Sequence, residues 1–258
     1  AAWTAGGAMN TGRRYGAGLG TSTAAWAGGG ADDPGGFSNK GEEYNGTAWT
    51  EVTNLPVSMG AFSAAGSQTA GLIIGGFSSP PGVVRSACLE YDGSSWSAGG
   101  SLTTARNNNN AFGIQTSAVT VGCEAPAAPA GWAAEIYNGT AWTTGNSLND
   151  GRGYMADPGA GTSSSAGLCA GGTNPGGFVT SVESWDGTSW SNGTAIPAAR
   201  AGQFASNGSP TGDYLITGGD SSYEDETFTY TENSEPNTFL NEGQVWYNST
   251  GNTLKFYN

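Results

Sequence analysis

The chain has 258 residues, of which only 11% are charged and 45 are glycine, and its formal net charge at pH 7 is -13. This acidic balance argues against a nucleic-acid partner, because binding of phosphate groups requires a basic surface. It also argues against docking on an anionic membrane. No apolar run approaches the roughly 18 to 20 residues of a membrane span, so we expect no membrane insertion.

A sequence unit recurs about every 47 residues along most of the chain. Each unit holds a glycine pair, a segment that ends in an aromatic residue, an Asn-Gly or Asp-Gly turn, and a tryptophan. The tryptophans Trp49, Trp96, Trp142 and Trp190 are 47, 46 and 48 residues apart. A period of this length, with a turn before each tryptophan, predicts a circular array of four-stranded blades, a β-propeller.

The glycine pairs occur in five registers, so we expect five blades. They lie at Gly28-Gly29, Gly75-Gly76, Gly122-Cys123, Gly171-Gly172 and Gly218-Gly219.

Four strands are predicted in each unit. The first is innermost and runs through small residues, as from Ala61 to Ala65, and the second is an apolar run such as Leu72 to Ile74. The third alternates into the aromatic residue, as in Val182 to Trp185, and the fourth carries the tryptophan. Asn-Gly or Asp-Gly between the third and fourth strands predicts a two-residue type I′ hairpin turn.

The two ends of the repeat are expected to pair. The last unit has predicted strands near Gln203 to Ser206, at Tyr214 to Thr217 and at Thr227 to Thr231, but no fourth strand follows. The segment Ala2-Trp3-Thr4 matches the predicted fourth strand of a unit, but the first three strands of that unit do not precede it. The sequence therefore begins in the middle of a repeat unit. Pairing these segments would complete the fifth blade, close the ring and remove two exposed sheet edges.

We therefore expect a propeller over residues 1–235 and an extension over residues 236–258. The extension does not match the repeat, and it predicts a β-hairpin of Gln244 to Tyr247 and Thr253 to Tyr257. Apolar and polar residues alternate in this hairpin, so one of its faces is apolar. We expect that face to pack on the ring or on another chain.

The spacing of glycine pair, tyrosine and tryptophan resembles the kelch repeat over nearly the whole chain, from Ala1 to about Glu232. The units are rich in Gly, Asn, Thr and Ser and have turns such as Tyr91-Asp92-Gly93-Ser94-Ser95-Trp96. In this composition they are more similar to kelch-like propellers in structural and tail-fibre proteins of marine bacteriophages. The segment Gly243 to Thr250 also resembles a module found beside such propellers. The resemblance implies an exposed binding or structural domain on a virion or fibre.

Several catalytic chemistries are excluded because the chain has no histidine. Triads that use histidine, histidine-ligated zinc and the copper-oxidase activity of some kelch-like proteins all require that residue. The turn at Asp186 resembles the Asp-box of sialidases, but that box is a structural turn. Cys88, Cys123 and Cys169 form no CxxC pair, and we expect free, buried thiols.

Carboxylates are the remaining enzymatic option. Glu42, Glu135 and Glu183 recur two residues before the aromatic of the third strand, and such repetition favours a structural role over a catalytic pair. The acidic stretch with Asp220 and Asp225 could hold calcium, but a solvated acidic face is the favoured interpretation. We therefore expect no enzymatic activity and no cofactor.

The candidate ligand-binding residues lie near the starts of the first strands and on loops. Arg13, Arg106, Arg152 and Arg200 should ring one mouth and either recognise a carboxylate or acidic sugar, or satisfy carbonyl groups at blade junctions. Asn107 and Asn108 add amides suited to sugar hydroxyls. Trp132 breaks the repeat register, so it either contacts a sugar or protein partner or packs locally. The candidate ligand-binding set is Trp132, Arg13, Arg106, Arg152, Arg200, Asn107 and Asn108.

These observations predict a non-enzymatic binding domain on a virion or other extracellular surface. It would recognise a host surface glycan or protein through loops on one propeller face. The alternative is a structural, decoration or assembly domain that contacts other virion or fibre subunits and binds no soluble ligand.

Overall fold

The computed structural model shows an all-β fold. Within its described ranges, no helix has the length and apolarity needed to cross a bilayer. The residues described are 5–32, 36–80, 82–124, 132–156, 160–202, 204–205, 214–219, 227–230, 245–248 and 253–256.

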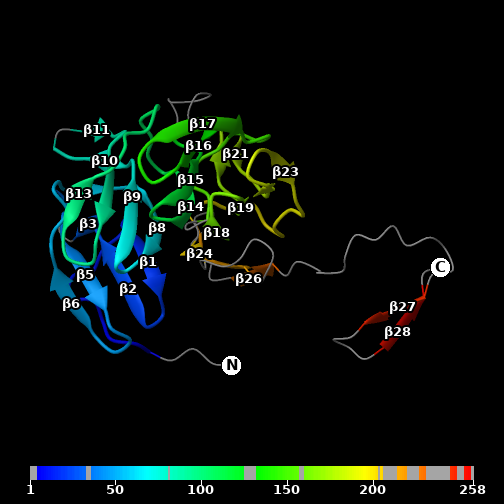
Figure 1. The fold of residues 1–258 in the computed structure, drawn as a ribbon, viewed down its shortest axis with the longest axis horizontal. Helices are drawn as coiled ribbons and strands as arrows, with labels where there is room; N and C mark the ends of the chain where they lie inside the picture. Colours follow the sequence, from blue (N-terminus) through cyan, green and yellow to red (C-terminus); the bar gives the residue numbers. More distant parts are fainter. Residues whose placement is uncertain are drawn as a thin grey trace.

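The main sheets are antiparallel and repeat one strand order, in which each strand pairs with the next one of its unit. Figure 1 shows the first strand of each sheet near the middle of the body and the fourth strand at the periphery. The sheets are β1 (Ala17–Thr21), β2 (Ala24–Gly28), β5 (Gly41–Tyr44) and β6 (Trp49–Val52); β8 (Ser63–Ser67), β9 (Ala70–Ile74), β12 (Cys88–Tyr91) and β13 (Trp96–Ala98); β14 (Asn110–Ile114), β15 (Ser117–Val121), β16 (Ala133–Tyr137) and β17 (Trp142–Ser147); β18 (Ala160–Ser163), β19 (Ala166–Ala170), β22 (Val182–Trp185) and β23 (Trp190–Asn192); and β24 (Phe204–Ala205), β25 (Tyr214–Thr217) and β26 (Thr227–Tyr230).

This arrangement is propeller-like, as the period predicted. The first strands of successive sheets lie beside one another, β1 by β8, β8 by β14 and β14 by β18. The sheet of β24 to β26 has three strands in the described part of the chain, and the predicted partner Ala2-Trp3-Thr4 lies outside that part.

Short strand pairs between the second and third strands were not predicted. They are β3 (Ala31–Asp32) with β4 (Gly36–Phe37), β10 (Phe77–Ser78) with β11 (Val83–Val84), and β20 (Thr173–Asn174) with β21 (Gly177–Phe178). Strand β10 also pairs with β7 (Met59–Gly60), which lies before the first strand β8.

The hairpin turns differ from the predicted two-residue form. Tyr44 pairs directly with Trp49, so four residues form the loop. Gly46 has φ 91°, whereas Asn45 is not among the positive-φ residues. Instead the Asn45 Oδ1 accepts the backbone N–H groups of Thr47 and Ala48, both at 2.9 Å. The side chain thus satisfies the turn, and only the glycine supplies a left-handed backbone. Asp92, Asn138 and Asp186 repeat this contact.

The glycine pairs tie each sheet to the next, and their structure shifts the first pair by one residue. Gly76 N–H donates to Arg106 O at 2.8 Å, and Gly30 N–H donates to Met59 O at the same distance. The structural pair of the first unit is therefore Gly29-Gly30, not Gly28-Gly29. Three consecutive glycines make the sequence alignment ambiguous there, and the φ values of 60° and 76° at Gly29 and Gly30 resolve it.

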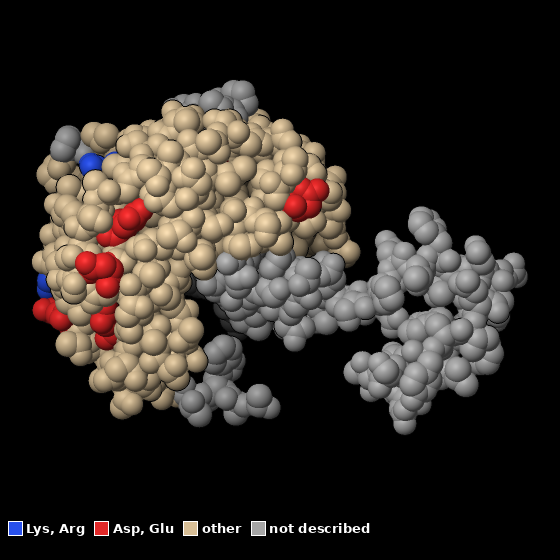
Figure 2. All heavy atoms as spheres, viewed as in Figure 1, with Lys and Arg blue, Asp and Glu red and all other residues tan. Residues whose placement is uncertain are grey.

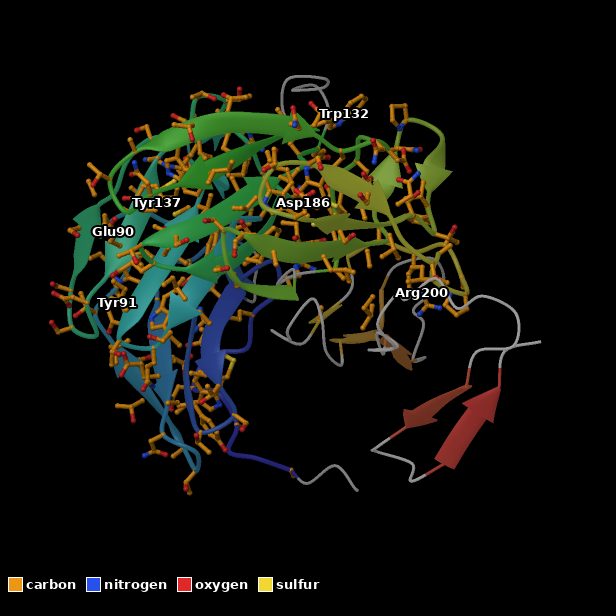
Figure 3. All side chains as sticks on the ribbon, turned by 45° about the vertical axis from the view of Figure 1, so that its right-hand side comes forward. Glu90, Tyr91, Trp132, Tyr137, Asp186 and Arg200 are labelled. Atoms are coloured by element: carbon orange, nitrogen blue, oxygen red, sulfur yellow. The ribbon has the colours of Figure 1, made fainter. Side chains whose placement is uncertain are left out.

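Aromatic side chains join adjacent sheets at their outer parts. Tyr91 Oη donates to Glu43 Oε1 at 2.8 Å, and Tyr137 Oη donates to Glu90 Oε1 across the next junction. Figure 3 shows Glu90 and Tyr137 on neighbouring sheets. Burial raises the pKa of Tyr137 to about 12, and the Glu90 hydrogen bond adds to the effect, so the hydroxyl remains a donor at neutral pH.

The three cysteines are free and buried, as predicted. Burial raises the pKa of Cys88 to about 12 and also raises that of Cys123. These thiols therefore act as small apolar side chains.

The C-terminal hairpin is confirmed with slightly shifted bounds. Strand β27 (Val245–Asn248) pairs with β28 (Thr253–Phe256). Figure 1 shows this hairpin apart from the four-stranded sheets, so the structure does not show the expected packing on the ring.

Candidate functional site

The arginines predicted to contact a ligand lie in the protein interior. Arg106 and Arg152 are completely buried, Arg200 is 1% exposed, and the Arg13 side chain is 6% exposed. This placement corrects the expectation that their guanidinium groups ring an open mouth. It agrees with the alternative that they satisfy carbonyl groups, since Arg13 donates to Gly29 O, Arg106 to Ala133 O, Arg152 to Gly171 O and Arg200 to Gly218 O.

Three of these arginines also form buried ion pairs with the repeated glutamates. Arg106 Nη2 lies 2.5 Å from Glu135 Oε1, and both side chains are at most 1% exposed. The same carboxylate accepts the backbone N–H groups of Thr103 and Thr104 at 2.6 and 3.2 Å. Glu135 therefore holds the segment that leads into β14 as well as the arginine. Matching sets are Glu42 with Asn10, Thr11 and Arg13, and Glu183 with Asn149, Asp150 and Arg152.

The second unit replaces this polar set by apolar residues. Met59 stands where the other units have arginine, Leu89 stands at the glutamate position, and Pro56 stands where Thr103 donates its N–H. Because proline has no N–H, the second unit lacks both the backbone donor at Pro56 and the glutamate that would accept its hydrogen bond. The last unit has Pro197 and Phe228 at the donor and glutamate positions but keeps Arg200, so the proline and the loss of the glutamate occur together whereas the arginine varies separately.

A different set of residues surrounds the mouth of the propeller-like body. Tyr15, Ala61, Asn108 and Tyr154 have left-handed φ values of 59°, 54°, 50° and 52°, and Gly202 has 65°. Each lies two residues after the arginine position of its unit. Backbone N–H groups donate from one to the next, Ala61 to Tyr15 O, Asn108 to Ala61 O, Tyr154 to Asn108 O and Gly202 to Tyr154 O, at 2.8 to 2.9 Å.

These residues line a cavity of about 670 Å³. A volume of this order suits a small ligand or part of a larger one. Five aromatic side chains contribute to its wall: Tyr15, Phe37, Phe77, Tyr154 and Phe178.

Exposed apolar side chains gather on the same face. In the described ranges, the large apolar side chains that are exposed are Tyr15 (60%), Phe178 (45%), Val83 (44%) and Ile114 (46%). Tyr15 and Phe178 line the cavity, and Val83 belongs to β11, which pairs with β10 beside it. Ile114 ends β14, at the far end from the mouth. Exposed aromatic groups at a concave surface are typical of a binding site.

A carboxylate lies among these aromatic residues. Glu124 Oε2 accepts a hydrogen bond from Asn107 Nδ2 at 3.0 Å and from Asn108 Nδ2 at 2.9 Å. Burial raises the pKa of Tyr154, and its hydrogen bond to Glu124 raises it further, so its hydroxyl also stays protonated. Glu124 is exposed, and it was not among the candidate residues from the sequence. The signal that could have found it is its register position directly after Gly122-Cys123.

The four consecutive asparagines divide into two pairs. Asn107 and Asn108, two of the candidate binding residues, line the cavity. Asn109 and Asn110 are at most 5% exposed and join neighbouring sheets, with Asn109 Nδ2 donating to Ser63 Oγ at 2.6 Å. Asn110 accepts from the Cys169 thiol at 3.1 Å.

Trp132 packs against the backbone segment that leads into β18, the first strand of the next sheet. A Cβ placed on Gly151 would lie only 2.0 Å from Trp132 Cδ2, so the indole covers this glycine. Trp132 is half-buried and does not line the cavity at the mouth. Figure 3 shows it at one edge of the molecule. The geometry favours local packing, the alternative weighed from sequence.

In the ranges that the structure describes, no group of three or more Cys, Asp and Glu side chains is placed to hold a metal ion. Asp220 and Asp225, the residues named for calcium, lie outside those ranges.

Comparison with known proteins supports the fold. No protein-family model and no curated protein matches this sequence. The chain is similar to a solved structure titled "Structure of YjhT", with a TM-score of 0.63 and 13% identity, over 82% of this chain and 74% of that chain. At this identity the likeness shows the fold alone, a propeller-like all-β fold.

The second unit provides a template for testing the buried pairs. Glu135→Leu should lower the free energy of unfolding by about 3 to 5 kcal/mol, because it leaves the buried Arg106 guanidinium without its carboxylate and removes the acceptor of two partly buried N–H groups. Adding Arg106→Met and Thr103→Pro, which copies Met59, Leu89 and Pro56, should recover most of that loss. Urea denaturation of the two variants measures this. A triple variant no more stable than Glu135→Leu would contradict the interpretation.

Acid should weaken the first sheet through Glu42. Burial acts to raise the pKa of this carboxyl, but hydrogen bonds from Asn10 N–H, Arg13 and Thr11 N–H outweigh it and lower the pKa. The stabilisation is therefore complete above the unfolded pKa of about 4.3 and is lost as the pH falls through the lower folded value. Unfolding free energies measured from pH 7 to pH 3 should fall more steeply for the wild type than for Glu42→Gln. Parallel curves would contradict this.

The contact of Trp132 with Gly151 predicts a site-specific steric effect. Gly151→Ala should destabilise by about 1 to 3 kcal/mol, because the new methyl overlaps the indole. The matched control is Gly12→Ala, since Gly12 precedes Arg13 as Gly151 precedes Arg152 and a Cβ there meets nothing within 4 Å. Thermal denaturation should show little change for the control. The cost of Gly151→Ala should shrink in a Trp132→Ala background.

Proposed function

We propose that this chain is a non-enzymatic binding domain that recognises a glycan through the aromatic cavity at its mouth. The observation that carries the proposal is the combination of exposed aromatic rings with the polar set of Asn107, Asn108 and Glu124 in one cavity. Aromatic rings offer flat apolar surface to the C–H faces of a sugar, and amide and carboxylate groups offer hydrogen bonds to its hydroxyls.

The cavity chemistry supports binding rather than hydrolysis. Hydrolysis of a glycosidic bond commonly uses two carboxyl groups about 5 to 9 Å apart. Among the described cavity-lining residues, Glu124 is the only acidic one. The repeated Glu42, Glu135 and Glu183 are buried in ion pairs, where a substrate does not reach them.

We further propose that the body is a five-bladed kelch-like propeller whose residues 1–4 supply the fourth strand of the last sheet. The chain of backbone hydrogen bonds from Tyr15 to Gly202 supports this, because it crosses four junctions between five units. Tyr15 N–H and Gly202 O are its two ends, and a bond between them would complete a ring. The glycine pairs that bond to the following unit support the kelch-like assignment.

The proposed setting is a virion or another extracellular surface, with a host glycan or protein as the partner and other virion or fibre subunits as neighbours. The similarity of the turns to bacteriophage propellers supports it. The visible face in Figure 2 is mostly uncharged, with scattered acidic groups and few basic ones, which disfavours a nucleic-acid partner.

A glycan array probed with the whole chain tests the proposal. We expect binding to a restricted set of sugars, reduced at least tenfold by Tyr15→Ala and by Phe178→Ala, because each removes an exposed ring from the cavity. The matched control is Ile114→Ala, since Ile114 is as exposed as Phe178 but lies at the far end of β14.

Light scattering on the same sample measures its oligomeric state and distinguishes glycan recognition from the alternative of an assembly domain without a soluble ligand. Sugar binding by a monomer supports the proposal. Absence of sugar binding together with a stable oligomer would overturn it in favour of an assembly domain.

A further inference from the structure

We infer that the ligand group bound over Glu124 is a protonated amine, carried by an amino sugar. This inference rests on the proposed glycan binding and names the sugar class. It follows from how the cavity uses its hydrogen-bond donors, from its aromatic walls, and from its charge.

The donors around Glu124 are already engaged with it. Asn107 Nδ2 and Asn108 Nδ2 both donate to Glu124 Oε2. A carboxylate has about four acceptor positions, so further donors can still bind. The set therefore holds an exposed carboxylate in a fixed position and leaves it an acceptor. An ammonium group, which has three donors and no acceptor, is the complementary ligand.

The aromatic walls favour the same charge. A cation is attracted to the face of an aromatic ring within about 6 Å of its centre. One such contact already exists at the mouth, where the Arg14 guanidinium carbon lies 5.7 Å from the centre of the Tyr15 ring. Tyr154, Phe37, Phe77 and Phe178 supply further ring surface around the cavity.

The charge of the site disfavours an anionic sugar. In the described part of the chain, no lysine or arginine lines the cavity with Glu124. Arg14 is nearby but lies over Tyr15, and the arginines once expected to bind an acidic sugar are buried. A carboxylate ligand beside Glu124 would therefore be repelled by it, and among the described residues that line this cavity none carries a positive charge to offset the repulsion, which costs binding energy.

Three hexasaccharides of matched length test the inference by calorimetry at pH 6. They are the hexamer of glucosamine, which is cationic, the hexamer of N-acetylglucosamine, which is neutral, and the hexamer of galacturonic acid, which is anionic. We expect the glucosamine hexamer to bind at least tenfold more tightly than the other two. A lysine-containing peptide and its acetyl-lysine form are run beside them.

Glu124→Gln isolates the charge while keeping the shape and the two amide contacts. It should weaken binding of the glucosamine hexamer about tenfold and leave the neutral hexamer unchanged. Because Glu124 is exposed, we expect the variant to fold, and circular dichroism checks this. The control is Glu51→Gln on β6, whose side chain is 59% exposed beside Lys40. Equal losses in both variants would show unspecific attraction to an acidic protein and would overturn the inference.

The outcomes separate the inference from the proposed function. Equal binding of the neutral and cationic hexamers, or tightest binding of the anionic one, overturns the amino-sugar inference and leaves glycan binding in place. Binding of the lysine peptide without any sugar overturns both and assigns the ammonium to a protein partner. No binding by any of these probes overturns the amino-sugar inference, and the glycan array then decides whether glycan binding stands.

Discussion

The structure depends on how the segment before each first strand is held to its sheet. A first strand enters the crowded middle of the body, and the backbone before it has N–H groups that need buried acceptors. In three units one glutamate meets this need by accepting two N–H groups and an arginine together. The same arginine position also supplies the backbone carbonyl that binds the glycine pair of the preceding unit, as at Arg106 and Arg200. One residue position therefore secures both the strand within its sheet and the sheet against its neighbour.

The apolar version at Met59 and Leu89 shows that the ion pair is one of two solutions to the same constraint. Buried ion pairs contribute little net stability when compared with well-packed apolar residues, because desolvation offsets their attraction. What both versions preserve is the path of the backbone. Met59 O still accepts from Gly30 N–H, as Arg106 O does from Gly76 N–H. The buried chemistry varies while the junction stays constant.

The residues around the mouth also combine a constant backbone conformation with variable side chains. The residue two positions after the arginine position has a left-handed φ in each of five units, yet it is Tyr15, Ala61, Asn108, Tyr154 or Gly202. From the sequence, Trp132 was a candidate because it breaks the repeat register, and Asn107 and Asn108 were candidates beside Arg106. Trp132 lies outside the cavity, whereas Asn107 and Asn108 line it together with residues in register whose identities differ. A repeat with fixed backbone positions can thus build an asymmetric site without any insertion.

The sequence period was sufficient to predict the propeller-like fold, the strand order and many strand bounds, such as Val182 to Trp185. It was sufficient because each unit is short and its pattern of turns and apolar runs is local. The site could not be predicted in the same way. Tyr15 and Tyr154 are 139 positions apart, and a tyrosine gives no indication of a left-handed backbone, although asparagine adopts one more often than most residues. The arginines were assigned to a surface because charge is usually exposed, and their buried glutamate partners become evident only when three positions of each unit are compared.

The buried pairs also change the meaning of the formal charge. The chain has 8 basic and 21 acidic residues. Setting aside the four interior arginines and the three glutamates paired with them leaves 4 basic and 18 acidic residues for the rest of the chain. Positive charge is thus concentrated inside, and the field outside is more acidic than the total suggests. At physiological salt such a field extends only about 8 Å, so it speeds the approach of a cationic group but does not select one. Selection requires a carboxylate held in the cavity itself, and Glu124, fixed by Asn107 and Asn108, is the residue in that position.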